Sequence, residues 1–78
     1  MSRYAVVYEA PLSDEGNWGA YAPDLPGLGV VGGTFEECRI NMASGIAAHL
    51  AALRERGFQV PEPTTRVEEL LVASQAKF

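Results

Sequence analysis

A long amphipathic helix with its own start and stop signals sets most of what this 78-residue chain can fold into. Thr34 and Glu37 form the pattern of a capping box, in which the hydroxyl accepts the Glu37 amide and the carboxylate reaches back. Arg54 falls in the last turn, and Gly57 suits the left-handed position just past the end. The sequence therefore predicts a helix from about Phe35 to Arg56. Its apolar face, at spacings of three and four, carries Cys38, Met42, Ile46, Leu50 and Leu53.

Three short strands are expected before that helix. Tyr4–Ala10 is rich in aromatic and β-branched residues, Trp18–Ala22 repeats that signal after a polar loop, and Leu28–Gly32 follows a loop with two prolines. Successive strands joined by short loops pair in antiparallel order. We therefore expect an α+β domain in which a three-stranded antiparallel meander packs one face on the long helix. The face expected to meet the helix carries Tyr4, Val6 and Tyr8.

The segment after the helix leaves two alternatives open. Pro61-Glu62-Pro63 ends a short extended piece. Thr65 and Glu68 then form a second capping-box pattern, which favours a short helix over Arg66–Ala73. The same segment is short enough to be a strand that adds to the sheet instead.

Two glycine patterns need an interpretation. Gly27–Gly32 spells GxGxxG, but a dinucleotide-binding loop must follow a strand and open a helix inside a βαβ unit. Here the glycines span an expected strand and the helix begins at its own cap, so the match is coincidental. Gly45, in the middle of the helix, either marks a close packing contact or is tolerated at a cost of up to about 1 kcal/mol.

The reactive side chains indicate binding rather than catalysis. Cys38 and His49 lie about three helical turns, roughly 16 Å, apart, so they cannot form a nucleophile–base pair within one chain. We expect Cys38 to be buried and His49 to border the core. Asp24, between two prolines, is expected to accept hydrogen bonds from amides of its own loop. One cysteine and one histidine are too few for a zinc site, and we expect no catalytic residues, no metal and no cofactor.

The charge balance points to a protein partner. Six basic and ten acidic residues give a net charge of −4 at pH 7. A phosphate-binding surface needs an excess of Lys and Arg, so direct nucleic-acid binding is not expected. An acidic domain is better suited to a basic protein.

The length of the chain and the composition of its segments lead to expectations about its oligomeric state and its location in the cell. A chain this short buries little core, and its single cysteine cannot form an internal disulfide. We therefore expect a homo-oligomer, a dimer or a tetramer. The N-terminus lacks the apolar core of a signal peptide and no apolar run approaches the ~20 residues of a membrane span. A cytoplasmic protein without membrane contact is the expectation.

Five motifs follow one another along the chain. They are the strand YAVVYEA, the segment Ala22–Gly27 (APDLPG), the helix start Gly33–Glu37 (GTFEE), the helix end Leu53–Gly57 (LRERG) and Val60–Pro63 (VPEP). Taken in order, these motifs resemble the HicB family of antitoxins. The resemblance covers residues 4 to about 65, and Leu28 stands where the family commonly has cysteine.

The resemblance implies a partial RNase H-like fold without nuclease chemistry. It also implies a partner, a small basic HicA-type toxin that is an mRNA interferase and that the antitoxin neutralises by masking its RNA-binding surface. Longer relatives carry a DNA-binding domain, whereas residues 1–78 are expected to be a single domain without one. Candidate partner-binding residues are Tyr8, Trp18, Tyr21 and Asp24, because aromatic side chains are favoured as interface anchors. For the three aromatics, a place in the sheet core is the alternative.

Two other functions stay open at this point. The chain could be an orphan self-associating regulator or scaffold without a toxin. A residual metal-dependent nuclease using Asp24 would rest on the implied fold ancestry alone.

Overall fold

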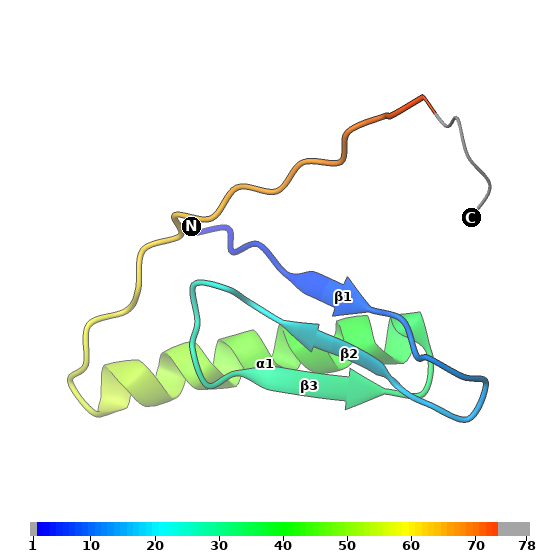
Figure 1. The fold of residues 1–78 in the computed structure, drawn as a ribbon. Coiled ribbons are helices and arrows are strands. Elements are labelled where there is room, and N and C mark those ends of the chain that lie inside the picture. The colour runs from blue at the N-terminus through cyan, green and yellow to red at the C-terminus, as the bar shows by residue number, and fades with distance from the viewer. Residues whose placement is uncertain (1, 74–78) are drawn as a thin grey trace.

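The computed structural model describes residues 2–73 and contains three strands followed by one helix (Figure 1). The strands are β1 (Val7–Glu9), β2 (Trp18–Tyr21) and β3 (Gly29–Gly32), and the helix is α1 (Phe35–Glu55). The strands form one antiparallel sheet in the order β1-β2-β3. The helix lies across one face of that sheet. This arrangement confirms the expected α+β fold of a meander and a long helix.

Strand register decides which side chains face the helix. Tyr8 pairs with Ala20, and Ala20 pairs with Val30 on the other side. These three residues share the face that packs on α1, because side chains alternate along a strand. Tyr4 and Val6 also pack against the core, as expected, although β1 itself begins only at Val7. The outer face carries Val7, Glu9, Gly19, Tyr21, Gly29 and Val31.

The two ends of α1 follow the sequence signals closely. The Thr34 hydroxyl accepts the Glu37 amide at 3.0 Å, and the Glu37 carboxylate accepts the Gly33 amide at 2.9 Å. The carboxylate therefore satisfies an amide one residue further out than the usual capping box. At the other end Arg56 is the cap, and Gly57 has a φ of +72°, which is the left-handed conformation that glycine adopts without steric cost.

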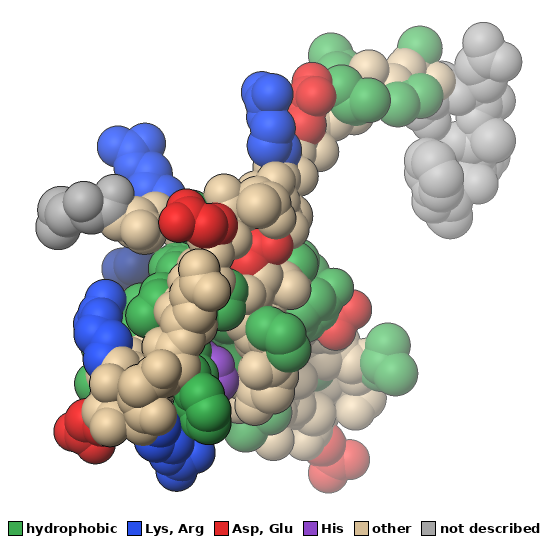
Figure 2. All heavy atoms as spheres, turned by 90° about the vertical axis from the view of Figure 1, so that its left-hand side faces the viewer, with side chains coloured by type: hydrophobic (Ala, Val, Ile, Leu, Met, Phe, Trp, Pro, Cys, Tyr) green, Lys and Arg blue, Asp and Glu red, His purple; other side chains and the backbone are tan. Residues whose placement is uncertain are grey.

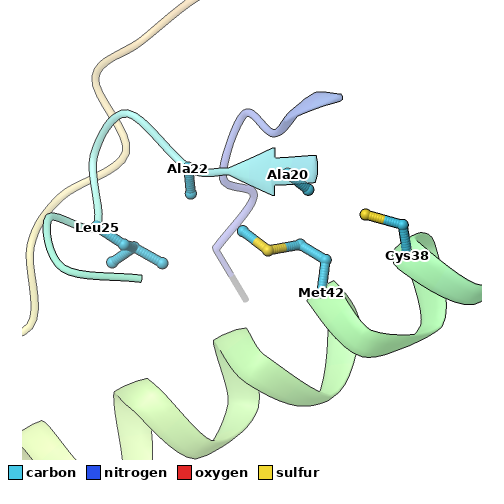
Figure 3. Packing of buried hydrophobic residues seen from close by; sticks show 5 residues of the cluster. All are labelled: Ala20, Ala22, Leu25, Cys38 and Met42. Atoms are coloured by element: carbon cyan, nitrogen blue, oxygen red, sulfur yellow. The ribbon is translucent and has the colours of Figure 1, made fainter. Parts of the chain in front are cut away.

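The buried core lies between β2, the loop after it and the first half of α1 (Figure 3). It consists of Ala20, Ala22, Leu25, Cys38 and Met42. Leu25 comes from the proline-rich loop and reaches down toward the helix. Half-buried side chains from all three strands and from later turns of α1 surround these five. Cys38 is fully buried, as expected for a small apolar residue.

Gly45 allows the middle of α1 to approach the sheet. A Cβ atom at this position would lie 3.3 Å from side-chain carbons of both Leu28 and Val30. That distance is tighter than an ordinary van der Waals contact, so with a larger residue here the Leu28 and Val30 side chains would have to shift by a few tenths of an ångström. Of the two readings of Gly45, the close packing contact is the correct one.

The expectation of a regular element over Arg66–Ala73 is wrong. Among the described residues the chain after Gly57 forms neither helix nor strand, and it runs past the N-terminus away from the sheet (Figure 1). The Tyr4 hydroxyl donates to the Pro61 carbonyl at 2.6 Å. Thr65 does not cap a helix, because both its amide and its hydroxyl donate to Asp24.

Candidate protein-binding surface

One end of the sheet gathers the start of the helix and the β1–β2 loop. Glu9 ends β1, Trp18 begins β2, and Trp18 pairs with Gly32 at the end of β3. Two residues later Phe35 begins α1. The topology therefore brings the β1–β2 loop and the first turn of α1 to the same end of the molecule, which we call the hairpin end (Figure 1).

Phe35 joins two aromatic residues of the sheet at the hairpin end. Its ring centroid lies 4.9 Å from that of Tyr8 and 5.2 Å from that of Trp18. Interplanar angles of 62° and 70° make both contacts edge-to-face, an arrangement that favours aromatic pairs. The Phe35 side chain stays 41% exposed. It therefore offers an apolar surface held in place by two neighbours.

Exposed acidic side chains lie at the same end of the molecule as that apolar surface. They come from the end of β1, the β1–β2 loop and the first turn of α1: Glu9, Asp14, Glu15, Glu36 and Glu37, all exposed. Arg39 is the basic residue nearby in the sequence, and its guanidinium pairs with Glu36 at 3.2 Å. Acidic residues in the first turn are also favoured by the helix dipole. The hairpin end thus carries an aromatic centre, formed by Tyr8, Trp18 and Phe35, together with five exposed acidic residues.

The opposite end of the molecule differs in charge. Arg3 precedes β1, Arg54 and Arg56 end the helix, and Arg66 follows the extended C-terminal segment. Figure 2 looks onto this end and shows Arg side chains spread around it. Glu55 and Glu62 lie in the same part of the chain, so this end carries both signs. The excess negative charge is therefore concentrated at the hairpin end.

Asp24 ties the proline-rich loop to the C-terminal segment. Its carboxylate accepts the amides of Thr64 and Thr65 at 3.0 and 2.9 Å and their hydroxyls at 3.1 and 2.8 Å. Hydrogen bonds from Thr65 first, and from Thr64 next, hold the pKa of Asp24 below its ordinary value of 3.8, because they stabilise the charged form. The prediction that Asp24 caps its own loop is wrong, since its donors lie forty residues along the chain.

The four candidate partner residues do not form one cluster. Tyr8 and Trp18 are half-buried around Phe35 near the hairpin end. Tyr21 is 44% exposed on the outer face of the sheet. Asp24 belongs to the clamp with Thr64 and Thr65. The sequence analysis missed Phe35, although its place as the first helical residue after the cap beside two acids could have indicated an exposed aromatic.

The other side chains that could take part in catalysis or metal binding do not come together in one site. Cys38 is buried, and His49 is half-buried farther along the same helix. Within residues 2–73 no group of three or more His, Cys, Asp or Glu side chains is placed to share a metal ion. Both carboxylate oxygens of Asp24 are engaged by threonines.

Comparison with known protein families identifies the family to which this chain belongs. The family model of the HicB-like antitoxin of bacterial toxin-antitoxin systems matches residues 4–77. The chain belongs to the HicB-like antitoxin family. Neither the curated proteins nor the solved structures contain a match, so the RNase H-like assignment stays a prediction.

The family motifs occupy distinct places in this HicB-like protein. The APDLPG segment forms the loop that carries Asp24 and buries Leu25, and the GTFEE segment is the capped start of α1. The VPEP segment carries the Pro61 carbonyl that Tyr4 binds. Asp24 of the APDLPG segment accepts hydrogen bonds from Thr64 and Thr65, which directly follow the VPEP segment. In the described part of the chain, no helix has the length and apolar character needed to span a bilayer.

Proposed function

We propose that this protein neutralises a small basic mRNA interferase of the HicA type by covering the toxin's RNA-binding surface. Family membership supports the antitoxin role. In this proposal the protein acts by binding and carries out no covalent chemistry. Because the target acts on mRNA, the complex is placed in the cytoplasm.

The charge distribution is the observation that carries the proposal. An RNA-binding toxin needs a basic surface, and this chain has a net charge of −4 with acidic residues gathered at the hairpin end. Complementary charge speeds the encounter of two proteins and suppresses wrong partners. A partner bound at the hairpin end would place its basic groups against these acidic residues.

The aromatic centre supplies the apolar part of that contact. Interfaces are anchored by a few large side chains in a region that excludes water, with charged residues at the rim. Phe35 is exposed at the surface, and Tyr8 and Trp18 hold its ring. We therefore assign Phe35, Trp18 and Tyr8 to the toxin contact. Tyr21 and Asp24 lie toward the other end of β2, so the proposed contact does not include them.

Charge reversal tests this assignment. The partner tested is a small basic HicA-type protein, sought in the gene next to this one and used in a catalytically inactive form. Binding is measured by calorimetry at two salt concentrations. Glu15→Lys should weaken binding roughly 3–10-fold, with a smaller effect at high salt. Glu62→Lys changes the charge equally at the other end and should leave the affinity within twofold.

Growth rescue provides the second measurement. Co-expression of the wild-type protein should restore the growth of cells that make the active toxin, and Phe35→Ala should reduce that rescue. Absence of any complex together with absence of rescue would end the proposal. Equal effects of Glu15→Lys and Glu62→Lys on toxin binding would show that the hairpin end is not the toxin-binding surface.

An orphan self-associating scaffold is the second candidate function. Large apolar side chains are exposed in the C-terminal segment, with Leu70 at 73% and Leu71 at 102%, and such exposure favours self-association. A gene without a small basic neighbour, together with a stable oligomer, would support this alternative over the antitoxin role.

A further inference from the structure

Residues 66–73, which we call the arm, are an apolar segment held away from the body of the chain. Every arm residue is exposed. The large side chains are Val67, Leu70, Leu71 and Val72, with exposed fractions of 64%, 73%, 102% and 77%. Isolated apolar residues are common on protein surfaces, but four within six consecutive positions form a patch that marks an interaction site.

The residues directly before the arm, which we call its root, are held in place by the body of the chain. They set the direction in which the arm leaves. Pro61 and Pro63 each restrict φ, the Pro61 carbonyl accepts the Tyr4 hydroxyl, and Asp24 holds Thr64 and Thr65. Figure 1 shows the chain leaving this point and running past β1 without returning to the sheet. Ordering a segment has an entropic cost. A pinned root with an apolar arm beyond it is therefore best explained by a surface on another molecule.

The sheet offers one open edge to such an arm. The edge at β3 is partly occupied, because the Asn41 side chain donates to the Val31 carbonyl at 2.9 Å. Among residues 2–73 no strand pairs with the outer side of β1. Unpaired strand edges readily accept another extended chain. Along an extended arm, Val67 and Leu71 face one side and Leu70 and Val72 the other, so each face of the enlarged sheet would gain two apolar side chains.

The area that the arm could bury favours the β1 edge of a second copy of this chain as its binding site. Fully burying a Val or Leu side chain removes roughly 60–120 Å² from water, so one arm with the surface it covers accounts for about 500–1,000 Å². Stable interfaces bury about 1,200–2,000 Å² in total. One arm alone buries less than that area, whereas two arms exchanged around a two-fold axis bury about 1,000–1,900 Å².

We propose that two copies of this protein exchange their arms, each arm lying as an added strand along the β1 edge of the other copy. Glu68 and Glu69 of the arm are opposite in charge to Arg3, four residues before the start of β1, and like in charge to Glu9 at its end. This favours a pairing in which the arm's glutamates lie toward the Arg3 end of the edge. This proposal does not rest on toxin binding, because it concerns the protein alone.

Matched leucines test the exchange. Leu71 on the arm and Leu12 in the β1–β2 loop are 102% and 106% exposed, so aspartate at either position leaves the single-chain fold unstrained. By light scattering after size exclusion, the wild-type full chain should be a dimer at micromolar concentration. Leu71→Asp should weaken dimerisation at least tenfold, and Leu12→Asp should leave it unchanged. The helical circular dichroism signal should be the same for all three, because α1 takes no part in the exchange.

Isotope-filtered NMR on a mixture of labelled and unlabelled chains identifies the strand edge that binds the arm and shows whether it belongs to another chain. Contacts between the Leu71 methyl groups and β1 should appear between chains, and outward-facing β1 amides should exchange slowly in the wild type and rapidly in Leu71→Asp. The proposal is overturned by a monomer at millimolar concentration, by an intact Leu71→Asp dimer, or by arm contacts within one chain. A monomeric wild type whose toxin binding is lost in Leu71→Asp would assign the arm to the toxin instead. Loss of toxin binding in Glu15→Lys, tested separately, would not bear on the exchange.

Discussion

The backbone of Gly32 lies against the backbone of Cys38, where β3 leads into α1. A Cβ atom on Gly32 would stand 2.5 Å from the Cys38 nitrogen and 2.8 Å from its Cα atom. Both neighbours are backbone atoms at the start of a capped helix, so they cannot move aside as a flexible side chain would. Only glycine allows the strand and the helix to meet this closely.

Gly32→Ala should therefore be strongly destabilising. The added methyl group must displace the first turn of α1 from the sheet, and overpacking of this kind typically costs about 1–3 kcal/mol. Urea unfolding monitored by circular dichroism measures the free energy of unfolding. Gly33→Ala is the matched control, because its Cβ atom would lie 3.6 Å from the Glu37 carboxylate, and it should change stability by less than about 0.5 kcal/mol. Equal costs at both positions would contradict the explanation.

Asp24 should make the attachment of the C-terminal segment sensitive to acid. Its pKa is lowered in the folded protein by hydrogen bonds from Thr65 and Thr64. A carboxyl group with a depressed pKa contributes stability above its unfolded value, and that contribution is lost as the pH falls through the folded pKa. Attachment should therefore be constant above about pH 4 and weaken only below 3.8. Carboxyl-carbon NMR shifts of Asp24 and amide shifts of Thr64 and Thr65 should follow the same titration.

Substitutions at the clamp separate the hydrogen bonds from the charge. The double variant Thr64→Ala with Thr65→Ala should raise the pKa of Asp24 toward its ordinary value, because the hydroxyl donors are lost. Asp24→Asn should release the segment at every pH, seen as faster amide exchange at Thr64 and Thr65. Asp14→Asn, in the β1–β2 loop, should do neither. Unchanged exchange in Asp24→Asn would show that the clamp does not hold the segment.

Met42 should carry a large share of the packing energy. Its side chain is 1% exposed between the sheet and the helix, and truncation of a buried methionine to alanine costs about 2–5 kcal/mol. Ile40, on the solvent side of the same helix at 57% exposure, is the control, and Ile40→Ala should cost under about 1 kcal/mol. Denaturant titration of both variants decides the point, and comparable losses would contradict the described core.

Cys38 should be unreactive until the chain unfolds. The side chain is fully buried, and a thiol reacts only when it is accessible as a thiolate. Alkylation followed by mass spectrometry should show no labelling of the folded protein over hours and rapid labelling in denaturant. Prompt labelling in native buffer would mean that the start of α1 opens readily.

The features predicted correctly from the sequence are those with local signals. The capping residues Thr34 and Glu37, the terminal Gly57 and the apolar spacing of α1 all act within a few residues of one another, so the helix was placed to within one residue. The strand predicted over Tyr4–Ala10 is four residues too long, because pairing with β2 limits β1 to Val7–Glu9. Strand length depends on the partner and not on composition alone.

The features that were missed depend on contacts between distant positions. Thr65 and Glu68 have the local pattern of a helix cap, but Thr65 instead donates to Asp24, and no helix forms. Phe35 reads as an ordinary helix residue until Tyr8 and Trp18 are brought beside it. Of the four candidate partner residues, Tyr8 and Trp18 are brought together beside Phe35 only by the fold, and their role in partner binding stays a prediction.

The clamp at Asp24 also determines how the molecule would respond to a mechanical load. A pull applied to the C-terminal segment reaches Thr64 and Thr65 first, and their hydrogen bonds pass it to the loop between β2 and β3. The helix, which precedes Thr64 in the chain, is thereby bypassed. Tension should break the four bonds at Asp24 before it unwinds any turn of α1, so the first extension step in an optical trap would leave the sheet and helix intact.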